Sequence, residues 1–129
     1  MIAKDIMTKD VITVPPSMIV RDLAMTLIKN QISGVPVADK NGKIVGIVSE
    51  SDIIAKKGKQ VSAIMNKKVV SIGADTPVEE IAQTMTTYHV KRLPVMNGRK
   101  LIGIVSRADI VSAIASGEHV ALHTPIYDL

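Results

Sequence analysis

The chain alternates apolar and polar positions in a pattern that predicts the same elements twice. Apolar residues keep helical spacing from about Val20 to Ile28 and again from Val78 to Met85. Each stretch is followed by two short apolar runs separated by an Asn-Gly dipeptide, which favours a tight hairpin turn. The pattern therefore predicts two amphipathic helices, each leading into an antiparallel hairpin.

Capping and turn residues predict where these elements begin and end. Ser17 is the expected N-cap of the first helix, while Thr76 and Glu79 predict a capping box in the second, with Pro77 at its first position. A shorter helix is expected after each hairpin, so each copy reads strand, helix, strand, strand, helix. The expected strands are 35–38, 44–49, 93–96 and 101–106, and 11–14 is expected to be a short strand or an extended entry segment.

A fixed internal period relates the two copies. Segment 46–52 reads GIVSESD and segment 103–109 reads GIVSRAD, while earlier matches such as Ile6 with Ile64 are 58 residues apart. A unit of about 60 residues buries only roughly 60% of its unfolded surface, so two such units gain stability by pairing. We therefore expect a face-to-face pair with similar clefts between the copies. The expected division is a first unit at 1–60, a second at 61–117 and a tail at 118–129.

Composition narrows the class of protein. The chain has 129 residues, 47% of them hydrophobic, and no cysteine. This composition is typical of a compact globular protein and gives no sign of a disulfide framework. No apolar run approaches the ~18 residues of a membrane span, and the N-terminus lacks the apolar core of a signal peptide. We expect a cytoplasmic protein without a membrane segment.

The charge balance favours anionic partners. Lys and Arg number 16 against 12 Asp and Glu, which gives a net charge of +4. Proteins that hold single-stranded nucleic acid usually stack bases on aromatic side chains, yet this chain has no Phe or Trp. Nucleotides therefore rank ahead of nucleic acid as ligands. The lysine-rich segment 56–68 is interpreted as a solvated linker.

Four elements occur in the same order in both copies. They are an Asp-Ile-Met or Ala-Ile-Met opening, a capped helix, a Val-Pro-Val or Leu-Pro-Val strand, and a Gly-hydrophobic-x-Ser-x-x-Asp ending. Over roughly residues 1–117 this order resembles a tandem pair of CBS domains, also called a Bateman module. The resemblance implies an α+β fold of two βαββα units packed as a pseudo-two-fold pair, and a disc-like homodimer. It also implies regulatory binding of adenosyl ligands in the clefts between the copies.

The Ser-x-x-Asp endings supply the first candidate site residues, Ser49 with Asp52 and Ser106 with Asp109. Each pair lies where a strand is expected to turn into a helix. A carboxylate there can accept hydrogen bonds from both ribose hydroxyls, and the serine hydroxyl with the helix-start N–H groups suits a phosphate oxygen. The alternative is a capping box, in which serine caps the helix and the acid reaches back. Recurrence within the four-element pattern favours ligand contact, with capping as a second role.

The copies differ just before their Val-Pro or Leu-Pro pair. The resemblance implies that basic residues at this point reach ligand phosphates, and the second copy has Lys91 and Arg92 there. The first copy has Gly34 and lacks a phosphate cation of its own, although Arg92 could serve either cleft. We expect unequal clefts. The alternative for the two cations is a solvated charge pair.

Because the chain has no Phe or Trp, adenine would have to lie between aliphatic side chains, with main-chain groups reading its edge. Core packing is the alternative for these apolar residues. The candidate nucleotide-binding residues are Thr13, Val14, Gly34, Val35, Pro36, Ser49, Asp52, Ser71, Ile72, Lys91, Arg92, Leu93, Pro94, Ser106 and Asp109.

The chain contains no Ser-His-Asp order, Cys-His pair, HExxH or P-loop, so we expect no enzyme and no required cofactor. His119 and His123 have no carboxylate or thiolate cluster nearby, so we expect no metal site. The predicted function is a regulatory module that binds AMP, ADP or ATP as an energy or metabolite sensor. Its output would act on an effector protein in trans, unless the chain is a fragment of a larger protein. The alternatives are a nucleic-acid-binding protein that uses its basic surface and a purely structural dimerisation module. A homodimer is also expected from apolar helix residues, namely Met25, Leu27, Ile28 and Met85.

Overall fold

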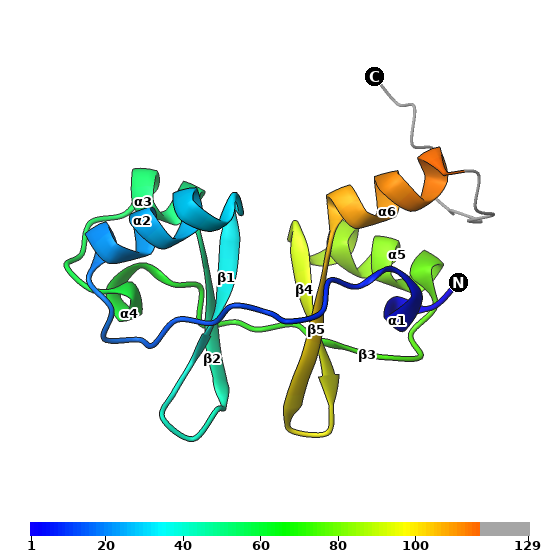
Figure 1. The fold of residues 1–129 in the computed structure, drawn as a ribbon, viewed down its shortest axis with the longest axis horizontal. Coiled ribbons are helices and arrows are strands. Elements are labelled where there is room, and N and C mark those ends of the chain that lie inside the picture. Colours follow the sequence, from blue (N-terminus) through cyan, green and yellow to red (C-terminus); the bar gives the residue numbers. More distant parts are fainter. Residues whose placement is uncertain (117–129) are drawn as a thin grey trace. The chain divides into compact units, whose positions relative to one another are not determined.

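The computed structural model describes residues 1–116, which divide into two compact units (Figure 1). The central unit consists of residues 12–69. The outer unit combines residues 1–11 with the described residues from 70 onward. The first residues of each sequence repeat therefore join the unit that is built mainly by the other repeat.

The central unit combines a two-stranded sheet with three helices. Strand β1 pairs antiparallel with β2, and Val14 makes a parallel bridge to Val37 on β1. The elements are α2 (Val20–Asn30), β1 (Gly34–Ala38), β2 (Ile44–Ser49), α3 (Glu50–Ala55) and α4 (Val61–Ile64). The core of this unit consists of Val14, Leu23, Leu27, Val35, Val37, Val48, Val61 and Ile64.

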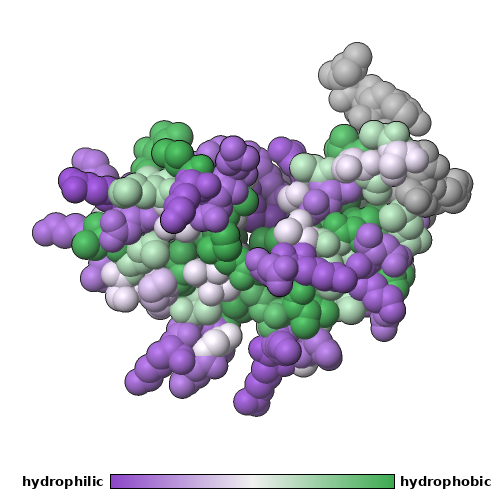
Figure 2. Space-filling view, viewed as in Figure 1, coloured by the Kyte–Doolittle hydropathy of each residue, from purple (hydrophilic) through white to green (hydrophobic). Residues whose placement is uncertain are grey.

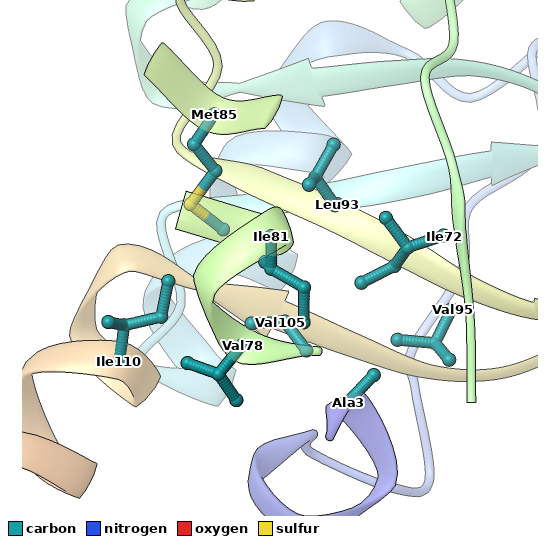
Figure 3. Packing of buried hydrophobic residues seen from close by; sticks show 9 residues of the cluster. All are labelled: Ala3, Ile72, Val78, Ile81, Met85, Leu93, Val95, Val105 and Ile110. Atoms are coloured by element: carbon teal, nitrogen blue, oxygen red, sulfur yellow. The ribbon is translucent and has the colours of Figure 1, made fainter. Parts of the chain in front are cut away.

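The outer unit repeats this plan with a three-stranded sheet. Its strands lie in the order β3-β4-β5, with β3 parallel and β5 antiparallel to β4. The elements are α1 (Ala3–Ile6), β3 (Ile72–Gly73), α5 (Val78–Tyr88), β4 (Arg92–Asn97), β5 (Lys100–Ser106) and α6 (Arg107–Ala115). Figure 3 shows the core, to which strands, helices and the N-terminal segment all contribute: Ala3, Ile72, Val78, Ile81, Met85, Leu93, Val95, Val105 and Ile110.

The predicted helices and hairpins are confirmed, whereas the caps predicted for α2 and α5 are wrong. The segment 11–14 forms no strand and makes only a bridge at Val14. Helix α2 has Ile19 rather than Ser17 as its N-cap, and α5 has Pro77. In both helices a distant main-chain carbonyl already accepts from the first helical N–H: Val20 N donates to Lys59 O at 3.0 Å and Val78 N to Met1 O at 3.1 Å. The helix starts therefore depend less on a side-chain cap. The Thr76 hydroxyl instead accepts from Gly73 N at 3.0 Å, in the turn before α5.

The opening segment of each repeat packs on a strand glycine of the unit that it joins. Thr8 exchanges two main-chain hydrogen bonds with Ile104, at 2.9 and 3.0 Å, which brings Met7 onto Gly103. A Cβ added at Gly103 would overlap the Met7 side chain. The same arrangement recurs in the central unit, where a Cβ at Gly46 would lie 2.6 Å from Met65 Sδ. Glycine is therefore required here by the close approach of the methionine.

The predicted dimer face is only partly exposed. Met25 and Ile28 are 62% and 78% exposed, and Ile54 on α3 is 85% exposed. Figure 2 shows apolar surface over this part of the central unit. Leu27 and Met85, by contrast, belong to the two cores, because helical periodicity turns them inward. The homodimer stays a prediction.

Replacing Gly103 with alanine should destabilise the protein by about 1–3 kcal/mol, because the new methyl group must displace Met7. Urea denaturation of the variant measures this loss. Gly73→Ala is the matched control, because its Cβ would lie 3.7 Å from Thr76 Oγ1, an ordinary contact. Met7→Ala combined with Gly103→Ala should cost less than the sum of the two single changes. Additive losses would contradict direct packing of Met7 on Gly103.

Candidate functional site

Both Ser-x-x-Asp motifs lie at a junction between a strand and a helix, as predicted. Strand β2 ends at Ser49 and α3 follows at once, and β5 ends at Ser106 before α6. One oxygen of Asp52 accepts from Ser49 N at 2.9 Å and from Ser49 Oγ at 3.2 Å. The matching oxygen of Asp109 accepts from Ser106 N at 2.8 Å and Ser106 Oγ at 3.1 Å. The capping role is thus real in both units, and it uses only one oxygen of each carboxylate.

The second carboxylate oxygen distinguishes the two motifs. Asp52 Oδ1 lies 2.9 Å from Lys56 Nζ, which also donates to Ile64 O at 3.1 Å. The lysine that pairs with Asp52 has no counterpart at the matched position of the outer motif. Ala113 stands where Lys56 stands in the other copy. The outer motif therefore keeps one carboxylate oxygen available to a ligand hydroxyl.

In each hairpin the motif serine is the cross-strand partner of the residue that precedes the Val-Pro or Leu-Pro pair. Arg92 on β4 is the cross-strand partner of Ser106, and Gly34 on β1 is the partner of Ser49. Side chains of such a pair project from the same face of a sheet. The next pair, Leu93 with Val105, is buried in the core. Because successive side chains alternate, Arg92 and Ser106 project from the face opposite the core.

Further basic residues lie at the same end of the outer sheet. Arg107, the first residue of α6, donates its N–H to Lys91 O at 3.0 Å, so Lys91 and Arg107 lie next to the Arg92–Ser106 pair. Both side chains are exposed, whereas Arg92 is half-buried. Three basic residues thus lie close in the main chain to the motif that carries Asp109, and of these Arg92 projects from the same face as Ser106. Such a site favours a ligand that carries both hydroxyl groups and negative charge.

The remaining predicted residues fall into three groups. Pro36 and Pro94 are paired with Ile47 and Ile104, one step along the face that carries the motif serines. The aliphatic candidates lie in the two cores, in agreement with the alternative of core packing. They are Val14, Val35, Ile72 and Leu93. Thr13 and Ser71 are exposed immediately before two of them. Binding through these six positions stays a prediction, and for the four core residues it is limited to main-chain groups.

Sequence reasoning missed two residues beside the central motif. Lys56 follows Asp52 by four residues, a spacing that predicts a helical ion pair. Glu50 occupies the position that Arg107 holds in the outer unit, and its N–H donates to Ser33 O at 2.9 Å. Position-by-position alignment of the two copies could have found the Glu50 contrast.

Two other functional classes find no support in the part of the chain that the structure describes. No group of three or more His, Cys, Asp or Glu side chains there could hold a metal ion. No helix there is both long and apolar enough to cross a bilayer. His119 and His123 lie outside the described residues.

A protein-family model described as the CBS domain matches the chain twice, over residues 3–58 and 61–116. The chain belongs to the CBS domain family. The predicted α+β class and the tandem CBS units are thereby confirmed. CBS pairs are in general regulatory modules, although some relatives of this one carry enzyme names.

Solved CBS pairs share the fold over most of their length. The CBS pair of protein MJ0100, in complex with 5′-methylthioadenosine and S-adenosyl-L-methionine, is 32% identical with a TM-score of 0.87, over 92% of this chain and 98% of that one. CBSX2 in complex with AMP is 30% identical with a TM-score of 0.82, over 89% and 96%.

A curated relative is much longer than this CBS pair. The L-aspartate semialdehyde sulfurtransferase of Methanocaldococcus jannaschii is 34% identical over 113 residues. The match covers 84% of this chain but 22% of the relative, so the similarity concerns one part of that protein.

Ser106→Ala should lower the free energy of unfolding by about 0.5–2 kcal/mol, because the N-cap of α6 is lost. The measurement is urea denaturation without added ligand. Ser112→Ala is a control in the same helix: Ser112 is exposed, and alanine favours helix, so stability should hold or rise slightly. Equal losses in both variants would argue against the capping role.

Proposed function

We propose that this CBS pair is a regulatory module that binds adenine nucleotides, namely AMP, ADP or ATP. It serves as a sensor of energy or metabolite state and acts on an effector protein in trans. A ligand regulates such a module only through its different affinity for two states of the protein. No catalytic role is part of this proposal.

One observation carries the proposal: Arg92 pairs with Ser106 across β4 and β5, beside the carboxylate of Asp109. The carboxylate has an oxygen left for a ribose hydroxyl after capping its helix. Arg92 presents a planar guanidinium that suits bidentate contact with a phosphate. The two groups together match the ribose and the 5′-phosphate of a nucleotide.

The structural relatives support the adenosyl class. One CBS pair is known in complex with AMP, and another in complex with 5′-methylthioadenosine and S-adenosyl-L-methionine. These compounds share adenosine and differ at the 5′ position. The basic residues of the outer unit favour the phosphorylated members, because the sulfonium of S-adenosylmethionine is itself a cation.

A thermal-shift screen tests the proposal on the full chain. At a hundredfold its dissociation constant, a ligand adds about 2.7 kcal/mol of stability, which raises Tm by several degrees. AMP, ADP, ATP, NAD and S-adenosylmethionine are compared, and we expect stabilisation by the adenine nucleotides. No stabilisation by any of them would favour the structural dimerisation module. Steeply salt-dependent binding to DNA or RNA alone would favour the nucleic-acid alternative.

Asp109→Ala should weaken AMP binding more than Asp52→Ala does. Losing charge-assisted hydrogen bonds to the ribose costs on the order of 1.5–3 kcal/mol, or about tenfold to a hundredfold in Kd. Isothermal calorimetry on both variants decides the point, at a temperature where both are folded. Small and equal losses would mean that the carboxylates serve as caps only.

Arg92→Ala should reduce the preference for AMP over S-adenosylmethionine, because the phosphate loses its bidentate partner while the sulfonium loses a repulsive charge. Competition calorimetry measures the ratio of the two affinities. Arg99→Ala is the control, an exposed arginine in the β4–β5 turn. An unchanged ratio in Arg92→Ala would remove Arg92 from the phosphate site.

A further inference from the structure

The two Ser-x-x-Asp motifs of the chain have neighbours of different charge, and these neighbours occupy equivalent positions in the two copies. In the outer unit, Lys91, Arg92 and Arg107 gather at the end of the sheet that carries Asp109. This end of the sheet therefore carries three basic residues near the motif, with Arg92 on the face of Ser106. A dianionic phosphate is attracted there, and the attraction is strongest beside half-buried Arg92.

The central motif has the opposite balance. Ser33 and Gly34 replace the two cations before the strand, and Glu50 replaces the cation at the first helical position. Glu50 N bonds to Ser33 O in the same way that Arg107 N bonds to Lys91 O, so the two positions are equivalent in structure. A phosphate near Asp52 would meet a second carboxylate instead of a guanidinium.

Lys56 does not restore the missing phosphate cation. Its ammonium forms an ion pair with Asp52 Oδ1 at 2.9 Å and donates to Ile64 O at 3.1 Å. Its positive charge is therefore largely balanced by the Asp52 carboxylate. The ion pair neutralises Asp52, so Glu50 adds a further negative charge at the start of this helix. A carboxylate has about four lone-pair positions, so Asp52 can still accept from a ribose hydroxyl beside Lys56.

We infer that the two motifs of this chain select adenosyl ligands by the charge at the 5′ position: the outer motif takes phosphorylated adenosine, and the central motif takes adenosyl compounds without a phosphate. This inference rests on the proposed function. It adds that the chain responds to two classes of ligand at once. Glu50 and Arg107 are then the residues that set specificity, because they hold the same position with opposite charge.

Calorimetry with AMP and 5′-methylthioadenosine tests the inference on the full chain. The two probes share adenine and ribose and differ in charge at the 5′ position. Asp109→Ala should weaken AMP about tenfold or more and change the Kd of 5′-methylthioadenosine less than about threefold. Asp52→Ala should do the reverse. Higher ionic strength should weaken AMP alone, since salt screens only the charged ligand.

A charge exchange provides a second, independent variant that does not disturb the caps. Glu50→Arg gives the central motif the residue of the outer one, and Glu50 is exposed, so the fold should be kept. We expect AMP to gain a second binding equivalent and 5′-methylthioadenosine to lose affinity. Glu80→Arg is the matched control, because Glu80 is also an exposed acid in a first helical turn, that of α5. It should leave both ligands unchanged.

The outcomes separate this inference from the function on which it rests. If neither probe binds the unaltered chain, the proposed function fails and the inference fails with it. If both bind but the same aspartate variant weakens them equally, the function stands and the inference is overturned. Two equal equivalents of AMP on the unaltered chain, or no gain of AMP binding in Glu50→Arg, would also overturn it.

Discussion

Each unit is closed by a methionine that packs directly on a glycine in its hairpin. Met7 lies on Gly103 and Met65 on Gly46, and main-chain bonds from Thr8 and from Asn66 hold the two segments in place. Because both methionines come from the opening of the other repeat, neither repeat makes a complete unit from its own residues. The outer unit is discontinuous in sequence, so its core forms only when Ala3 meets residues that follow at 72–110.

The Ser-x-x-Asp motif lies at a helix start in both units and, under the proposed function, has two roles. The hairpin strand delivers the serine to the start of a helix, where it becomes the N-cap and the aspartate accepts its N–H. Capping fixes the carboxylate before any ligand arrives, so less conformational entropy is lost on binding. Capping and ligand contact were alternatives in the sequence; in the structure they are compatible, because each role needs a different oxygen.

The repeated motif conceals a difference between the copies. The chain keeps serine and aspartate in both places, but Glu50 of the first copy corresponds to Arg107 of the second, and uncharged Gly34 corresponds to Arg92. Lys56 is held by two oxygens in the central unit, and alanine stands at its place in the outer one. This shared geometry with different charged neighbours is the basis of the two ligand preferences that we infer.

The sequence by itself determined what depends on local pattern. Helical spacing, Asn-Gly turns and the 58-residue period predicted α2, α3, α5 and α6, both hairpins and the position of both motifs, because these signals act between near neighbours. They missed α1 and α4, and α4 lies in the segment 56–68 that was interpreted as a solvated linker. Only the tertiary structure decided which carbonyl groups accept from Val20 N and Val78 N, and which glycines Met7 and Met65 pack on. It also decided that Leu93 is buried in the core while Lys91, two residues earlier, is exposed. Those outcomes depend on contacts between residues far apart in the chain, which a local pattern does not encode.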